Sequence, residues 1–433
     1  MSVAMAATAM HPARVGTQSS KDPVRASLVL WLGILLCVTV LQRFAVPGTG
    51  GIVGVGFAVA FMLVIHAVSR GRLRLDPVRV GLYGFAAATL LATLFGRTQG
   101  FSPDSLFMLL VLYLPFILMV EVERSTYEMM LEVFQRVMIL SALAGLLQFA
   151  IQFVLGPDAM FPLDLILPQD FFIQGFNLRI GVGEGVELLK STGLWFLEPS
   201  HFSQALAFAI VIELLHARRP PVLLLFACAY IVSFSGTGAL LLIALVVPLA
   251  FRLRWWWLLL LPAILLPLLP FLSGVPPFSL FLDRLDELNN PMASGSMRLF
   301  GPYWLVADVI LDHPRALFFG FGPGSVETIV QSLDYAVQDS SWLKLFVEYG
   351  LIGTFGFTVF YLHALFRHAP DRILAIACLF QFLFLGGYLN AFYVQFLYMA
   401  LVAWPRIRTT AFRGASRNPV QAHLAPQARR HPA

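Results

Sequence analysis

The chain has 433 residues, of which 58% are hydrophobic and only 12% are charged, and its mean hydropathy is +0.79. This composition leaves too little polar surface to cover a soluble globule of that size, so we expect an integral membrane protein. In a membrane protein, the net charge of +5 is explained by the Lys and Arg residues that set the topology, so we expect no nucleic-acid partner. The three cysteines, Cys37, Cys228 and Cys378, each lie in an apolar run, which indicates packing rather than a disulfide or a metal site.

Residues 1–26 and 413–433 are polar and rich in small residues, which predicts a disordered cytosolic leader and a disordered cytosolic tail. Between them lies a membrane domain, residues 27–412. A helix that crosses the hydrocarbon core needs about 20 mostly apolar residues. This window predicts an all-α membrane protein with about twelve transmembrane helices, at residues 27–46, 51–68, 78–95, 105–120, 133–155, 199–215, 221–234, 238–251, 255–272, 342–366, 373–386 and 388–404.

The turns between these helices alternate in charge. The basic turns contain Arg70, Arg72, Arg74, Arg79, Arg124, Arg218, Arg219, Arg252, Arg254, Arg367 and Arg372, and Arg406 and Arg408 follow the last helix. Because Lys and Arg are enriched in cytoplasmic turns, we expect both termini in the cytosol and two long connections, residues 156–198 and 273–341, on the outside. Within the second connection, residues 302–311 are apolar but too short to span, which predicts a short helix at the membrane surface. Trp404 fits an anchor at the headgroup level.

No H-E-x-x-H, G-x-S-x-G, P-loop or dinucleotide-binding motif is present in the sequence, which excludes the common chemistries that depend on them. The remaining candidates are charged or titratable residues expected near the outer mouth of the bundle: Lys190, Glu198, His201, Arg298, Arg315 and Asp339. Converging cations would bind a diphosphate, and a nearby carboxylate would take a proton from an attacking hydroxyl. These residues alone predict an anionic ligand on the outer face.

Each candidate also has a purely structural interpretation. A solvated or headgroup-facing charge explains Arg315 equally well, and packing explains His201. Glu198 precedes Pro199, so it is favoured at a helix N-terminus by the helix dipole alone. The glycines of GFGPGS, including Gly322 and Gly324, allow either a close approach to a ligand or a simple turn. The residues by themselves leave both interpretations open.

Three stretches resemble the bacterial polysaccharide polymerase and O-antigen ligase family, with the Wzy-type polymerases as the nearer match. They are KSTGLWFLEPSHFSQAL at 190–206, GSMRLFGPYWLVADVILDHPRALFFGFGPGS at 295–325 and DSSWLKLFVEYGLIG at 339–353. The resemblance implies a polymerase that joins polyprenyl-diphosphate-linked oligosaccharide units into an exopolysaccharide or O-antigen chain. It also implies a place in the bacterial inner membrane with the reaction on the periplasmic face, and neither a cofactor nor a metal.

The resemblance also implies roles for individual residues. Arg298 would bind the diphosphate. Lys190 and Arg315 would be further cations of the diphosphate site, and Arg179 is an alternative to Lys190. Either Asp339 or Glu198 would assist the acceptor hydroxyl. The rest of the substrate site would comprise His313, His201, Gly322 and Gly324. A chain-length regulator and a flippase of the same pathway would be partners.

Asp339 and Ser340 stand where ligases of the family usually have a histidine and an asparagine, which favours polymerisation. An O-antigen ligase of the same family is the nearest alternative. A twelve-helix transporter or flippase for a lipid-linked or anionic substrate is the alternative from another class. The short basic connection after the sixth predicted helix and the scarcity of charge within the helices argue against it.

Overall fold

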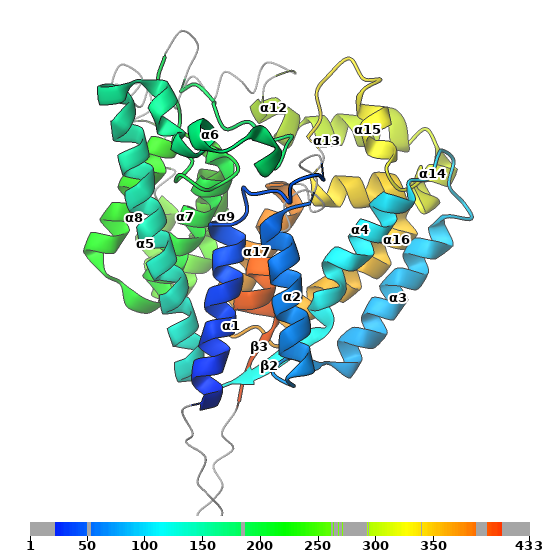
Figure 1. The fold of residues 1–433 in the computed structure, drawn as a ribbon. Helices are drawn as coiled ribbons and strands as arrows, with labels where there is room; N and C mark the ends of the chain where they lie inside the picture. The colour runs from blue at the N-terminus through cyan, green and yellow to red at the C-terminus, as the bar shows by residue number, and fades with distance from the viewer. Residues whose placement is uncertain are drawn as a thin grey trace, which may run out of the picture.

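The computed structural model describes residues 22–49, 53–182, 187–260, 263, 267, 271, 292, 294–338, 340–386 and 396–408. These residues form a bundle of helices that is covered at one end by short helices and loops (Figure 1). Four helical stretches are long and apolar enough to cross a membrane: α5 (Arg124–Leu155), α7 with its π-helical continuation η4 (Pro199–Ala217), α9 (Gly236–Leu253) and α16 (Ser341–Phe366). The protein is therefore a helical membrane protein.

The bundle contains further helices. They are α1 (Asp22–Thr39), α2 (Val55–Ser69), α3 (Pro77–Thr93), α4 (Pro103–Tyr113), which continues as η1 (Leu114–Ile117), α8 (Pro220–Ser233), η5 (Trp256–Leu260), α17 (Arg372–Phe384) and η8 (Met399–Ala403). Ten of the twelve predicted windows coincide with helices, whereas 255–272 and 388–404 extend outside the described residues. Twelve membrane crossings accordingly remain a prediction.

Side chains expected at helix starts begin several of these helices. Asp76 accepts hydrogen bonds from the backbone of Val78 and Arg79, and Pro77 occupies the first position of α3. Ser102 caps α4 and Asp371 caps α17 in the same manner. These caps satisfy backbone donors that a helix leaves unpaired at its N-terminus, so each helix starts at a defined residue.

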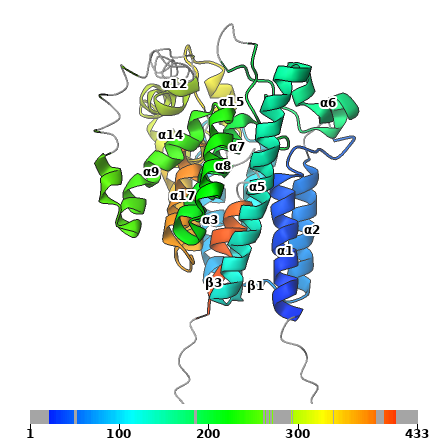
Figure 2. The same cartoon turned by 90° about the vertical axis from the view of Figure 1, so that its left-hand side faces the viewer.

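The two long connections lie at the same end of the bundle, which we call the loop end (Figures 1 and 2). The first contains η2 (Pro157–Met160), α6 (Pro162–Ile166) and η3 (Gln169–Phe171). The second contains α12 (Ser294–Leu299), α13 (Gly301–Leu305), η7 (Val306–Ile310), α14 (Pro314–Phe319) and α15 (Ser325–Val330). The apolar run 302–311 is thus helical, and its neighbours pack into a small core of their own around Leu305, Phe321 and Leu343.

The opposite end, which we call the sheet end, adds a small sheet to the mostly helical chain. Strands β1 (Arg74–Leu75), β2 (Leu118–Val122) and β3 (Pro405–Ile407) form a three-stranded sheet in that order, with β1–β2 antiparallel and β2–β3 parallel. Residues 118–120, predicted to end a helix, are strand because Leu118 and Met119 pair with β1 and Val120 pairs with the distant C-terminal strand β3. Hydropathy within one window carries no information about such a partner.

Two buried side chains hold the sheet end together. Arg79, 1% exposed, donates to the carbonyl oxygens of Leu118 and Ala403, both at 2.8 Å. Trp404 is fully buried, donates to the carbonyl oxygen of Pro115 at 2.8 Å and stacks on Trp31. The structure therefore places Trp404 in the core, and the expectation of a headgroup anchor at this position is wrong.

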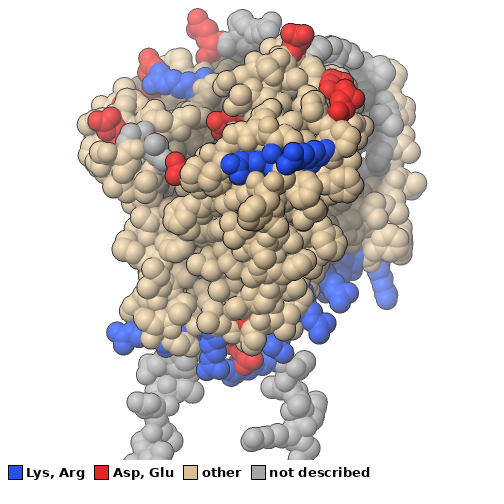
Figure 3. All heavy atoms as spheres, turned by 90° about the vertical axis from the view of Figure 1, so that its right-hand side faces the viewer, with Lys and Arg blue, Asp and Glu red and all other residues tan. Residues whose placement is uncertain are grey.

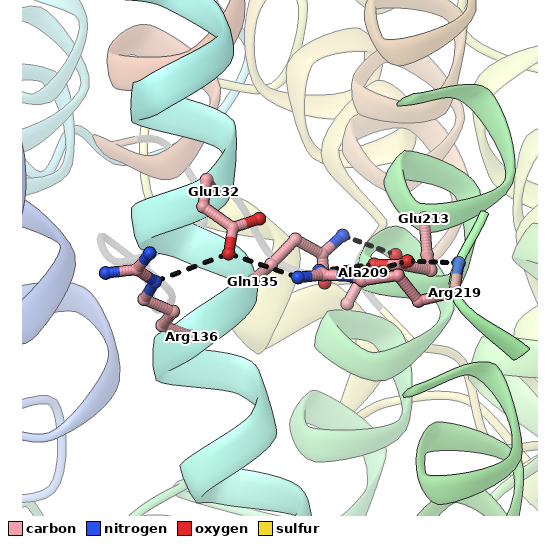
Figure 4. Close-up of polar contacts among 6 residues, drawn as sticks. All are labelled: Glu132, Gln135, Arg136, Ala209, Glu213 and Arg219. Carbon is pink, nitrogen blue, oxygen red and sulfur yellow. Dashed lines mark hydrogen bonds and ion pairs between the residues drawn. The ribbon is translucent and has the colours of Figure 1, made fainter. Parts of the chain in front are cut away.

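A charged cluster joins α5, α7 and α8 (Figure 4). The fully buried carboxylate of Glu213, in η4, accepts hydrogen bonds from Nε and Nη2 of Arg219, at 2.9 and 2.8 Å. Arg219 also reaches Glu132 of α5 at 3.1 Å, and Glu132 pairs with Arg136 at 3.3 Å. Gln135 donates to the carbonyl oxygen of Ala209 at 2.8 Å. This arrangement compensates the buried charge of Glu213 and fixes α7 against α5.

Basic side chains gather at the sheet end, below a broad surface without charged side chains (Figure 3). Exposed arginines there come from several turns of the predicted basic set, including Arg70, Arg72, Arg74, Arg406 and Arg408. Basic turns that the sequence predicts for one side of the membrane thus lie together at one end of the bundle.

Candidate functional site

The entry to α7 holds a carboxylate in a defined position at the loop end. Glu198 precedes α7 and accepts a hydrogen bond from Ser200 Oγ at 2.8 Å and one from the backbone N–H of Asn177 at 3.4 Å. Thr237, at the start of α9, donates to the carbonyl oxygen of Ser200 at 3.1 Å. The start of α9 therefore supports the turn that carries Glu198, and the N-terminal dipole of α7 favours its negative charge.

The second long connection contributes Arg298 to the surroundings of this carboxylate. His201, in the first turn of α7, lies near both charges. The Glu198 carboxylate and the Arg298 guanidinium both act electrostatically on the imidazole of His201, which also packs on Phe176 with ring centroids 5.8 Å apart. Arg298, in α12, donates from Nε to Oε1 of Gln338. We call Glu198, His201, Arg298 and Gln338 the Glu198–Arg298 site. It places one cation and one carboxylate around a histidine, at the end of the bundle that carries both long connections.

Asp339 lies outside the described residues, but both of its chain neighbours are described. The backbone N–H of Gln338 donates to the carbonyl oxygen of Met297 at 3.1 Å, beside Arg298. The N–H of Ser340 donates to the carbonyl oxygen of Gln338 at 2.8 Å, and α16 begins at the next residue. The chain positions on either side of 339 thus adjoin the Glu198–Arg298 site.

Lys190 and Arg179 belong to the first connection. Lys190 is 5% exposed, and its backbone N–H donates to the carbonyl oxygen of Ile180 at 2.9 Å, in the segment where Gly181 and Leu189 form a bridge. Arg179 forms an ion pair with Asp158 at 2.6 Å and lies over the ring of Phe161. The Arg179 charge is therefore already balanced by a carboxylate of the same connection.

Arg315 and His313 lie in a different part of the loop end, at the start of α14, across the bundle from α6 and α7 (Figure 1). Arg315 is exposed and donates from Nε to the carbonyl oxygen of Gly96 at 2.9 Å. A ring nitrogen of His313 contacts the carbonyl oxygen of Val309 at 2.8 Å, and the ring packs on Phe321. The contacts of both side chains fasten α14 to the end of α3 and to its own surroundings.

The glycine-rich loop at 320–324 packs against protein. Gly320, Gly322 and Gly324 all have positive φ, which glycine adopts without strain. A Cβ at Gly322 would lie 2.5 Å from the carbonyl oxygen of Gly100, and one at Gly324 would lie 2.6 Å from Ser102 Cβ. The described contacts therefore favour the turn interpretation for these glycines.

Two charged pairs at or near the loop end were missed by the sequence reasoning. Lys344 and Glu348, one turn apart in α16, form an ion pair at 3.4 Å with side chains 6% and 0% exposed. Arg43, which is 1% exposed, pairs with Asp164 of α6 and lies over Phe172. An ionisable residue within an apolar helix is a signal in its own right, and the i,i+4 spacing of Lys344 and Glu348 predicts their contact. For Arg43 no local pattern identifies Asp164 as its partner.

Within the described part of the chain, no group of three or more His, Cys, Asp or Glu side chains is arranged to hold a metal ion. No family model matches the chain, and no curated protein or solved structure matches it. The fold defines a helical membrane protein with a polar site at its loop end.

Proposed function

We propose that this protein is a polysaccharide polymerase, a glycosyltransferase that joins polyprenyl-diphosphate-linked oligosaccharide units into a long exopolysaccharide or O-antigen chain. The observation that supports it best is that His201 lies within electrostatic range of both Glu198 and Arg298. These residues come from two of the three stretches that resemble the Wzy-type polymerases, about one hundred positions apart. The third stretch begins at position 339, next to Gln338, the hydrogen-bond partner of Arg298.

The chemistry of the proposal assigns one task to each charge. The acceptor hydroxyl oxygen attacks the anomeric carbon of the donor glycan, a new C–O bond forms, and the bond from that carbon to the diphosphate oxygen breaks. The hydroxyl proton passes to a carboxylate, Glu198 or Asp339, and the lipid diphosphate leaves with the bonding electrons. Arg298 binds the leaving diphosphate, because a guanidinium pairs with phosphate oxygens in a fixed fork geometry. Catalysis then depends on positioning and on electrostatic stabilisation.

The proposal places the loop end in the periplasm and both termini in the cytosol of the bacterial inner membrane. The exposed arginines at the sheet end support this orientation, since Lys and Arg are enriched on the cytoplasmic side of membrane proteins. The substrate would therefore reach the Glu198–Arg298 site from the periplasmic leaflet.

The test is reconstitution of the purified full chain in vesicles with a polyprenyl-diphosphate-linked repeat unit. A polymerase produces a ladder of longer glycans on the lipid carrier, without added nucleotide sugar or metal. Movement of the intact unit across the bilayer with no lengthening would instead identify a flippase. Transfer of the glycan to lipid A-core, and only to it, would identify a ligase.

A further inference from the structure

An apolar cleft opens on the side of the bundle, far from the Glu198–Arg298 site. It has a volume of about 360 Å³ and lies between the second half of α2 and the segment where η1 passes into β2. Its walls include Phe61, Ile65 and Val68 of α2 and Leu114, Ile117 and Leu118. Ile65 itself is 61% exposed, so the cleft belongs to the apolar surface that faces hydrocarbon. A cleft with this lining fits a hydrocarbon chain.

Exposed arginines occupy chain positions next to the cleft on both sides of its end nearest the sheet. Ser69, the last residue of α2, lines the cleft, and the exposed Arg70 follows it directly. On the other side Leu118 lines the cleft, and its neighbour Met119 pairs with the exposed Arg74 of β1. The segment 70–75 contains three arginines, and the nearby carboxylates of Asp76 and Glu121 are paired with Arg79 and Arg408, so the charge around this end of the cleft is positive. Figure 3 shows basic side chains gathered at the sheet end of the molecule.

We propose that this cleft binds an anionic phospholipid of the leaflet at the sheet end. One acyl chain lies between α2 and η1, and the phosphate contacts Arg70, Arg72 and Arg74. Basic pockets between helices at a membrane surface recognise anionic head groups in this way. The site is independent of the proposed polymerase activity, because it lies at the other end of the bundle and takes a lipid of the bilayer itself.

The first test uses the full chain in nanodiscs that contain phosphatidylglycerol or phosphatidylcholine with the same photoreactive acyl chain. After illumination, labelled peptides are mapped by mass spectrometry. We expect phosphatidylglycerol to label residues 61–69 and 114–118 about 100-fold more than phosphatidylcholine, since each of the three arginines near the anionic lipid contributes about a fivefold preference. Equal labelling by the two lipids would overturn the proposal.

Two variants then test the contact with the acyl chain and the contact with the head group separately. Ile65→Trp fills the cleft and lowers labelling by about tenfold, the loss expected when two methylene groups leave an apolar site. Met62→Trp is the matched control, because Met62 is 60% exposed on the same helix but does not line the cleft. Arg70→Gln combined with Arg72→Gln and Arg74→Gln leaves chain labelling in place and removes the preference for phosphatidylglycerol. Unchanged labelling in Ile65→Trp, or an unchanged preference in the arginine variant, would contradict the site.

Discussion

Arg298 donates from its Nε to the side-chain oxygen of Gln338, forty residues further along the chain. This hydrogen bond joins α12 to the segment that leads into α16, and it orients the guanidinium in the same region as Glu198 and His201. A guanidinium presents its N–H donors in a planar fork, and this is the geometry that recognition of phosphate oxygens uses.

The first prediction concerns Arg298 itself. Arg298→Ala should reduce chain lengthening by about 100-fold or more, the loss typical of removing one electrostatic donor from a transition state. Protein level in the membrane and the supply of single repeat units should stay normal, as measured by immunoblot and by analysis of lipid-linked glycans. Arg97→Ala, which removes another exposed cation of the loop end, is the control.

Arg298→Lys separates a role in binding from a role in holding the loop. A lysine keeps the charge but not the planar fork, so on the proposed function it restores little activity. Nearly full activity in Arg298→Lys would show that the residue only anchors its loop, and long polymer in Arg298→Ala would exclude it from the site.

The second prediction concerns Glu198. Glu198→Gln keeps the shape of the side chain and its contact with Ser200 but removes the charge that would accept a proton. We expect the lengthening rate to fall by about 100-fold, within the usual range for a general base, with unchanged thermal stability. Asp170→Asn, an exposed carboxylate of the same connection, should have no effect. Full activity in Glu198→Gln together with an inactive Asp339→Asn would transfer the role to Asp339.

The third prediction concerns the buried pair Lys344–Glu348. Lys344→Met leaves a buried carboxylate without its partner at 3.4 Å, and this should destabilise the protein by about 3 kcal/mol. Adding Glu348→Gln removes the stranded charge, so the double variant should be more stable than Lys344→Met alone. Unfolding in detergent, analysed as a double-mutant cycle, measures the coupling. Strictly additive effects would show that the two charges do not stabilise each other.

The fourth prediction concerns the glycine-rich loop. At Gly320, with φ of +76°, a Cβ would collide with the carbonyl oxygen of Glu348. Gly320→Ala should therefore destabilise the loop end by about 2 kcal/mol through backbone strain and steric overlap. Nearby Gly100 has open space around its Cα, so Gly100→Ala should be close to neutral. Protease resistance of the loop end compares the two variants, and equal resistance would contradict the packing role of Gly320.

The chain's own residues predicted the helical membrane character and most helix positions, because hydropathy and capping are local properties. The windows 199–215 and 342–366, for example, coincide with α7 and α16. The basic turns could also be identified from the sequence, because the charge of a turn does not depend on contacts with distant residues. The β2–β3 pairing was not predictable in this way, because Val120 pairs with a segment almost three hundred residues away.

For the candidate site, the sequence determined which residues carry charge near the two long connections, and the tertiary structure decided which of them meet. Glu198 and Arg298 both lie within electrostatic range of His201, whereas Arg179 is paired with Asp158 and Arg315 donates to the end of α3. The physical reason is that a charge is a property of one residue, while its neighbours are set by the packing of helices far apart in the chain. Packing likewise decided that Arg43 is buried against Asp164 and that Gly320 lies against Glu348.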